Sequence, residues 1–206
     1  MSIDLFDKAL NGLEVRAEYD DGSGEVLDVG RWMGAVDAAD LQLLSLIDGP
    51  ALDVGCGPGR IAAALSARGI DALGLDIAPG AVRIARGRGA LVVHGSVFDP
   101  IPREGAWQHV LLVDGNVGIG GDPERLLRRT RELVAPGGSV HVEIGDNRGR
   151  HGLVRARLHS TDGALGGWFR WAHVSLAGIE PLAVAAGLSL VRVWEVADRC
   201  FAELCR

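Results

Sequence analysis

The sequence predicts a single α/β domain built on a mostly parallel sheet. The middle of the chain alternates short β-rich runs with helical patterns, which is typical of parallel strands joined by crossover helices. The chain ends in two β-rich runs, 188–196 and 200–204, whose joint is too short for a crossover helix, so they are expected to pair antiparallel. A length of 206 residues suits one well-buried domain.

The elements follow one another in a regular order. Strands are expected over 51–54, 72–76, 90–94, 109–113 and 139–144. The first crossover helix follows the glycines of 55–59, and Pro79 and Pro123 each open another helix at its favoured first position. A helix over 179–186, closed by Gly187, leads into the final strand pair.

Two stretches lie outside this alternation. Residues 1–48 contain an amphipathic helix around 38–47 and a hairpin-like piece near 26–32, and we interpret them as a helical lid segment ahead of a main domain over 49–206. Residues from about 145 to 172 are rich in Gly, Arg and His and are interpreted as an insertion. Within it, 154–159 alternates apolar and basic residues as a half-exposed strand does.

Composition excludes several classes of protein. The hydrophobic fraction is 48%, but no run approaches the roughly 18 to 20 apolar residues of a membrane span, and the start lacks a secretory signal, so a cytoplasmic location is expected. A net charge of −6 argues against a general attraction to nucleic acid or anionic membrane. Cys56, Cys200 and Cys205 form no CxxC pair, so neither disulfides nor a metal site is indicated.

The stretch LDVGCGPGR, residues 52–60, places a glycine-rich turn between the first strand and its helix. Such a turn brings bare backbone close to a ligand at the carboxyl ends of the strands. A dinucleotide site needs a third small residue where this chain has Arg60, and a P-loop needs a Gly-Lys-Ser/Thr ending that is missing here.

DVGCGPGR resembles the first motif of class I S-adenosylmethionine-dependent methyltransferases. The order of elements over residues 49–206 is also similar to that family's Rossmann-like, doubly wound seven-stranded sheet, which is mostly parallel with an antiparallel final strand. The resemblance implies S-adenosylmethionine as cofactor. The cofactor-binding residues that it implies are Asp53, Gly55, Cys56, Gly57, Gly59, Asp76, Ile77, Ser96, Val97 and Asp114.

The resemblance also gives these residues roles. Asp76 matches the acid that binds both ribose hydroxyls, and Ile77 would then pack on the adenine. Ser96 and Val97 match the loop at the adenine edge, although many relatives have Asp where this chain has Ser96. Asp53 either bonds the amides of its own loop or reaches the cofactor's amino group through water. Cys56 is interpreted as a small residue that fills a tight turn rather than as a nucleophile.

Two further stretches resemble small-molecule methyltransferases of actinobacterial type: DGNVGIGGDPERLLRRTRELVAPGGSVHVE and FRWAHV, residues 114–143 and 169–174. Members of the family that methylate nucleobases or glutamine carry Asn or Asp, then Pro-Pro and an aromatic residue, after the fourth strand. This chain has Asp114-Gly115-Asn116-Val117 there, which disfavours DNA adenine or protein glutamine as the acceptor.

The sequence says less about the residues that would bind the methyl acceptor. Methyl transfer to a hydroxyl benefits from a general base, and His173 is the candidate among six histidines because it follows a cluster of aromatic residues. Trp168 and Trp171, with Asn116 and with Trp32 as part of the lid, are the candidate substrate contacts, and Glu143 is another polar candidate. The alternative is that these rings pack the insertion onto the sheet.

The leading hypothesis is therefore a methyltransferase that acts on a small organic acceptor, at oxygen, with no metal, DNA or membrane partner. An RNA methyltransferase is the alternative enzyme, because the basic stretch 148–157 offers anion contacts, although we interpret it as a solvated hairpin. A non-catalytic S-adenosylmethionine-binding regulator is the alternative from another class, and a nicotinamide oxidoreductase ranks last.

Overall fold

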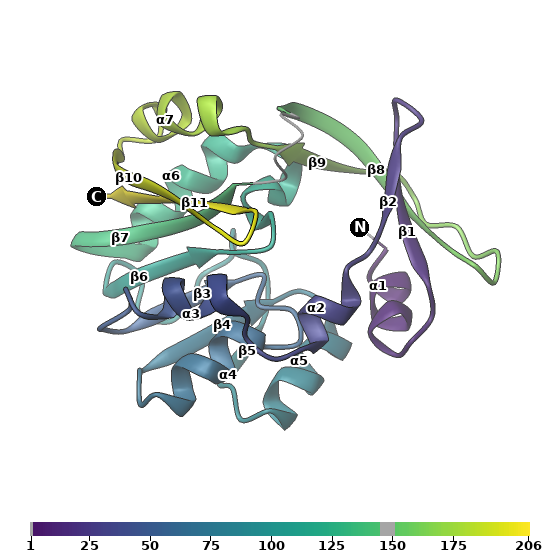
Figure 1. Ribbon diagram of the computed structural model, residues 1–206, viewed down its shortest axis with the longest axis horizontal. Coiled ribbons are helices and arrows are strands. Elements are labelled where there is room, and N and C mark those ends of the chain that lie inside the picture. Colours follow the sequence, from purple (N-terminus) through teal and green to yellow (C-terminus); the bar gives the residue numbers. More distant parts are fainter. Residues whose placement is uncertain (1, 145–150) are drawn as a thin grey trace.

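The computed structural model describes residues 2–144 and 151–206, and two β-sheets lie within these ranges (Figure 1). The larger sheet has seven strands in the order β10-β11-β7-β6-β3-β4-β5. They are β3 (Ala51–Val54), β4 (Ala72–Asp76), β5 (Val92–His94), β6 (Trp107–Leu112), β7 (Val134–Ile144), β10 (Ser189–Val196) and β11 (Arg199–Cys205). The smaller sheet has four strands in the order β2-β1-β8-β9, which are β1 (Val15–Tyr19), β2 (Gly24–Val26), β8 (Gly152–Ser160) and β9 (Phe169–His173).

The strands of the larger sheet run in the predicted relative directions. Its strands β7, β6, β3, β4 and β5 pair in parallel, whereas β11 is antiparallel to both β7 and β10. The joining helices are α4 (Arg60–Ala67), α5 (Pro79–Gly87), the 3-10 helix η1 (Asn116–Gly121), α6 (Pro123–Leu133) and α7 (Leu176–Ala185). The prediction of a mostly parallel seven-stranded sheet with an antiparallel final strand is confirmed.

Apolar side chains cover both faces of this sheet. In β6 and the residue after it, Val110 and Leu112 join one core cluster, while Leu111 and Val113 join another, as the alternation of a strand requires. The first cluster is closed by the buried leucines of α6, and the second by Ile61 of α4 and by α3 (Ala38–Leu44). Burial on both faces explains why these strands are nearly continuous apolar runs.

The N-terminal segment departs from expectation. It contains α1 (Ile3–Leu10), the β1–β2 hairpin and α2 (Val29–Met33) as well as α3. The hairpin-like piece expected near 26–32 is wrong, since the hairpin lies earlier and the side chain of Asp28 caps α2 by accepting from the Arg31 N–H at 3.1 Å. The sequence does contain a signal for this hairpin, which is Gly22 in its turn. Gly22 has a φ of 82°, a conformation that glycine favours.

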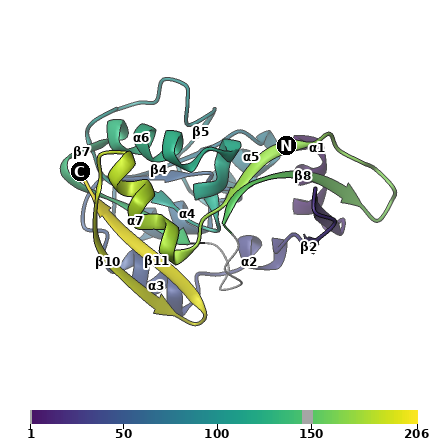
Figure 2. The ribbon, with the colours of Figure 1, turned by 90° about the horizontal axis from the view of Figure 1, so that it is seen from above.

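The smaller sheet joins this segment to the insertion. β1 pairs antiparallel with β8, whose bounds contain the strand expected at 154–159, and β8 pairs with β9. Figure 1 shows this sheet beside the carboxyl ends of the parallel strands, and Figure 2 shows β8 reaching from there toward α1. The first part of the expected insertion, residues 145–150, lies outside the described residues.

Within the described ranges, none of the helices has the length and apolar character needed to cross a lipid bilayer.

Candidate active site

A cavity of about 910 Å³ lies between the two sheets, at the carboxyl ends of β3, β4 and β6. Ligand pockets for small molecules usually have about 300–1,000 Å³, so this one has room for a nucleoside and a second small molecule. The predicted site residues that line it are Asp53, Gly55, Cys56, Gly57, Asp76, Ile77, Ser96, Val97, Asp114, Asn116, Trp32, Trp171 and His173. Gly59 and Trp168 do not line it.

The glycine loop has the left-handed backbone that glycine favours. Gly55, Gly57 and Gly59 have φ angles of 70°, 53° and 81°. A Cβ on Gly59 would lie 2.6 Å from the Cβ of Ala85 in α5, so this glycine serves the packing of two helices. A Cβ on Gly57 would meet nothing within 4 Å, so the backbone of Gly57 is bare toward the cavity that it lines.

Asp76 closes β4 and braces the same loop. Its Oδ2 accepts from the Gly57 N–H at 2.8 Å, and its Oδ1 accepts from the Ala78 N–H at 2.8 Å. Each carboxylate oxygen has a further lone pair for a ligand hydroxyl. Burial raises the pKa of Asp76. Next to it, Ile77 is 41% exposed although it is apolar, which leaves a surface that a flat ring can cover.

Cys56 and Asp53 are buried on either side of the loop's first glycine. The Cys56 Sγ would lie 2.7 Å from a Cβ on Gly74, and burial raises the pKa of the thiol, so the side chain packs and does not react as a thiolate. The Oδ2 of Asp53 accepts from the Ala62 N–H at 3.2 Å. Burial, reinforced by the charge of Asp114, raises the pKa of Asp53 to about 7.

Asn116 and Ser96 support loops rather than point freely into the cavity. The Asn116 Nδ2 donates to the carbonyls of Val54 and Gly55 at 3.0 and 2.9 Å, which ties η1 to the glycine loop. The Ser96 Oγ accepts from the Phe98 N–H at 3.2 Å, and this holds the loop after β5.

A network of ion pairs at the ends of β6 and β7 was missed by the sequence analysis. Asp114 has a φ of 55°, and both of its carboxylate oxygens accept from the Arg60 Nη2, at 2.7 and 2.9 Å. Its Oδ1 also lies 3.0 Å from the Arg31 Nη2. Arg199 bonds both oxygens of Glu143 at 2.8 and 2.9 Å. Burial opposes ionisation of Glu143, but Arg199 prevails and holds the pKa of this carboxyl below its ordinary value.

The network has one visible signal in the sequence. Arg60 occupies the position that a dinucleotide site reserves for a small residue, and its side chain is only 3% exposed. It pairs with Asp40 of α3 as well as with Asp114. The remaining partners come from segments far apart in the chain, such as Asp37 and Arg199, so no local pattern reveals them.

The smaller sheet supplies the other wall. Alternation along its strands turns Ala17, Tyr19, Phe169, Trp171 and His173 toward the cavity. The His173 ring lies edge-on to Tyr19 at 5.3 Å between centroids. The Tyr19 hydroxyl donates to Glu25 Oε1 at 2.6 Å, and Glu25 lines the cavity as well.

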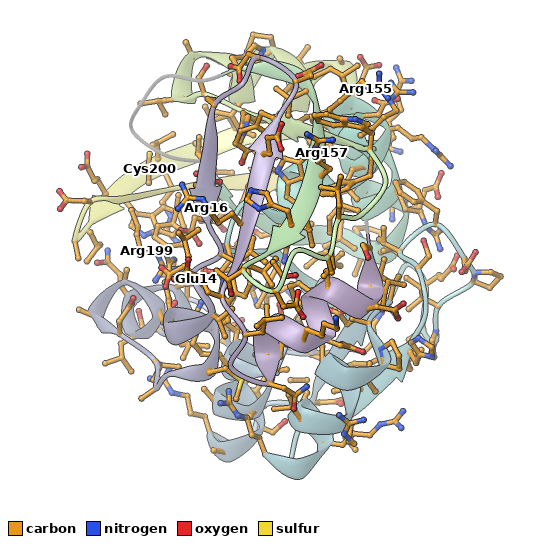
Figure 3. The ribbon with its side chains drawn as sticks, turned by 90° about the vertical axis from the view of Figure 1, so that its right-hand side faces the viewer. Glu14, Arg16, Arg155, Arg157, Arg199 and Cys200 are labelled. Carbon is orange, nitrogen blue, oxygen red and sulfur yellow. The ribbon has the colours of Figure 1, made fainter. Side chains whose placement is uncertain are left out.

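The candidate tryptophans do not all face the cavity. Trp32 packs on Phe6 at 5.6 Å and lines the cavity with Trp171. Trp168 instead lies by Arg155 and Arg157, whose guanidinium carbons are 5.5 and 4.7 Å from its ring. Figure 3 shows these two arginines on the side of the molecule that faces away from the larger sheet.

The doubly wound sheet, the glycine loop after β3 and the carboxylate that ends β4 define a class I methyltransferase fold. Residues 51–138 match the family model described as a methyltransferase domain. These residues therefore form a methyltransferase domain within the chain. No curated protein sequence matches the chain.

Solved structures support the same fold. A SAM-dependent methyltransferase from Bacteroides fragilis, in complex with S-adenosyl-L-homocysteine, has a TM-score of 0.80 and 19% identity and covers 98% of this chain and 92% of its own. CalS10, an amino pentose methyltransferase from Micromonospora echinaspora, has a TM-score of 0.62 and 17% identity, covering 86% of this chain and 94% of its own. The 1,6-didemethyltoxoflavin-N1-methyltransferase of Burkholderia thailandensis has a TM-score of 0.62 and 17% identity, covering 86% and 82%.

Proposed function

We propose that the protein transfers a methyl group from S-adenosylmethionine to an oxygen of a small organic acceptor. The observation that carries the proposal is Asp76, because it ends β4 in the cavity, braces the Gly57 backbone and keeps lone pairs on both oxygens for two ribose hydroxyls. Ile77, with Val97 and Ser96 across the cavity, would then enclose the adenine.

The bound cofactor would supply an electrophilic methyl group on a sulfonium. The chain's own residues would hold and align the reactants, which provides much of the rate of such a displacement. The loop backbone at Gly55 and Gly57 permits close approach, and Asp53 and Asp114 supply carboxylates next to it. No nucleophile on the protein is required.

His173 is the proposed general base on the acceptor side. It lines the same cavity as Asp76 from the opposite wall, beside the aromatic rings of Tyr19 and Trp171. An imidazole titrates near neutral pH and can take the proton of an acceptor hydroxyl as the new bond to carbon forms. Aromatic walls suit an acceptor with a flat or apolar body.

The similar structures favour a small acceptor over RNA. One acts on an amino pentose and another on 1,6-didemethyltoxoflavin, both of which are small molecules. In this protein the arginines of the basic stretch that the structure describes, Arg155 and Arg157, lie by Trp168 outside the cavity lining.

Calorimetry tests the cofactor assignment. S-adenosylmethionine and S-adenosylhomocysteine should bind, whereas NADH should not. Asp76→Ala should weaken binding by about 1–3 kcal/mol through the lost ribose hydrogen bonds. Asp71→Ala is the matched control, because Asp71 directly precedes the same strand but is exposed and pairs with Arg103. Equal affinity of the Asp76 and Asp71 variants would contradict the ribose role.

A screen of metabolite extracts for the mass gain of one methylene would identify the acceptor. His173→Ala should then lower turnover by about 10²–10⁴-fold, the usual contribution of a general base, with little change in S-adenosylhomocysteine affinity. Full turnover in this variant would exclude His173 as the base. An N-methylated product would overturn the assignment to oxygen.

A further inference from the structure

The smaller sheet presents to solvent the face that is turned away from the cavity. We call this the outer face, and it is formed by the side chains that alternate with the cavity-lining ones along β1, β8 and β9. Arg16, Arg155 and Arg170 lie on it and are exposed. Arg170 also borders the cavity, but it alternates with Trp171, so its side chain leaves β9 on the outer face. Figure 3 shows Arg16, Arg155 and Arg157 on this side of the molecule.

Basic side chains of the outer face lie opposite one another across the strands. Arg155 of β8 is directly opposite Arg170 of β9. Arg16 of β1 is directly opposite His159 of β8. Like charges in directly opposite positions destabilise a sheet, because their Cβ atoms are only about 4.5–5.5 Å apart. Local rules of this kind are broken mainly at functional sites, so the pair of arginines points to a function.

The positive charge of the outer face is only partly neutralised within the described ranges. Among its arginines there, only Arg157 bonds a carboxylate, since its Nε and Nη2 donate to Glu18 at 3.0 and 2.8 Å. Asp20 accepts from the backbone N–H of Arg155, at 3.3 Å, and not from its guanidinium. The whole chain has a net charge of −6, so this face differs from the average surface. Such a face complements an anionic partner.

Exposed apolar side chains lie among these arginines. Trp168, Leu153 and Leu165 are 38%, 55% and 59% exposed. Leu153 alternates onto the outer face with Arg155, and Leu165 reaches it through its bridge to β8. The guanidinium carbons of Arg155 and Arg157 lie 5.5 and 4.7 Å from the Trp168 ring, which holds the ring on this face. Trp and Arg are enriched among the residues that carry most of the binding energy of protein interfaces.

A nucleic acid fits these observations less well than a protein. Its affinity would come from many phosphate contacts, which the net charge of −6 opposes. Phosphates would also leave Leu153 and Leu165 exposed, whereas an apolar stripe on a protein would cover them.

We propose that the outer face binds an acidic amphipathic helix of a partner protein. A helix is a usual cover for one face of a sheet. The apolar stripe of this helix contacts Trp168 and the two leucines, and carboxylates beside the stripe accept paired hydrogen bonds from Arg155 and Arg170. The partner thereby neutralises the two like charges. It sits on the back of the cavity wall, and this role is additional to the proposed methyl transfer.

Fluorescence anisotropy with a labelled peptide tests the proposal. The probe is a peptide of about 20 residues, Glu and Leu at amphipathic helical spacing, and its control has Lys in place of every Glu. The wild type should bind the acidic peptide, with affinity that falls as salt rises, and should bind the lysine peptide at least about tenfold more weakly. Trp168→Ala should weaken binding of the acidic peptide by about 30-fold, as expected for a central interface residue.

Arg170→Gln separates binding from folding. It removes one charge of the pair with Arg155, so affinity for the acidic peptide should fall by about fivefold while the urea midpoint of unfolding rises. Arg128→Gln is the matched control, because Arg128 is 59% exposed but lies on α6 and pairs with Glu124. This variant should keep the wild-type affinity for the peptide.

Several outcomes would overturn the proposal. The first is a wild type that does not bind the acidic peptide or that binds the lysine peptide equally well. If poly(U) binds more tightly than the acidic peptide and the same substitutions weaken it, the face binds nucleic acid instead. If Arg170→Gln lowers the urea midpoint together with the affinity, this arginine supports the fold and has no docking role. If the wild type sediments as a dimer that Trp168→Ala dissociates, a second copy of the chain covers the face.

Discussion

The glycines at 55, 57 and 59 look alike in the sequence but differ in what surrounds them. Gly55 lies under the Asn116 amide, Gly57 faces open space, and Gly59 touches Ala85. A motif shows that backbone must be bare, but the packing of the neighbouring helices decides which glycine contacts a ligand and which contacts protein.

Gly59→Ala should destabilise the fold more than Gly57→Ala. Both changes put a side chain on left-handed backbone, at a cost of about 1–2 kcal/mol. At residue 59 the new Cβ also meets Ala85 at 2.6 Å, and such overpacking adds about 1–3 kcal/mol. Urea unfolding measures the difference. Equal losses of stability would show that α5 moves aside without cost.

At the residue scale, local motifs account for the position of several candidates on the cofactor side, but not for the acceptor side of the cavity. Asp76, Ile77 and Ser96 follow strands whose carboxyl ends share one edge, so a local motif finds them. Arg31 and Tyr19 line the cavity because of pairings with distant segments, which periodicity does not reveal. Trp168 was grouped with Trp171 on composition alone, although the two rings lie on opposite faces of the wall.

At the scale of elements, α3 is attached to the sheet by ion pairs as well as by its apolar side chains. Asp37 and Asp40 form a capping box at the start of this helix, and both side chains also bond Arg199. Asp40 is fully buried and pairs with Arg60 too. Burial opposes ionisation of Asp40, but the hydrogen bond from Arg60 prevails and lowers its pKa.

Asp40→Asn should cost about 3 kcal/mol of folding free energy, because removal of one partner leaves buried charge uncompensated. Asp37→Asn is the matched change in the same capping box. The Asp37 side chain is 44% exposed and Asn is an equally good cap, so this variant should lose less than about 1 kcal/mol. Thermal or urea unfolding of both variants checks the contrast, which equal losses would contradict.

The two sheets differed in how far the sequence could predict them. The inner parallel strands β3, β4 and β6 are buried on both faces, so apolar runs place them within a few residues, whereas the edge strand β5 is only partly buried. The expected strand 139–144 nevertheless begins at Val134, since β7 continues past Pro136 with an irregular register opposite β6. The smaller sheet pairs β1 with β8 across most of the chain, and that pairing leaves no trace in either segment alone.

At the scale of the whole molecule, two buried titratable groups change the free energy of unfolding with pH in opposite directions. Burial raises the pKa of Asp53 from 3.8 to about 7. The contribution of Asp53 to the stability of the fold is therefore full below pH 3.8 and is lost as the pH rises toward 7. Burial, with the charge of His109, lowers the pKa of His141 from 6.5 to about 4. The contribution of His141 is full above pH 6.5 and is lost as the pH falls toward 4.

Because these windows overlap, the wild type should show a shallow dependence of stability on pH between about 5 and 6.5, and single variants should uncover the two slopes. Asp53→Asn removes the acid, so its stability should rise with pH relative to the wild type. His141→Gln keeps a polar partner for His109, which lies 3.1 Å away, and its stability should fall with rising pH relative to the wild type. Each difference should be on the order of 2 kcal/mol across the range. Urea unfolding of the ligand-free protein at several pH values measures these slopes, and curves parallel to that of the wild type would show that the two groups titrate alike in the folded and unfolded chain.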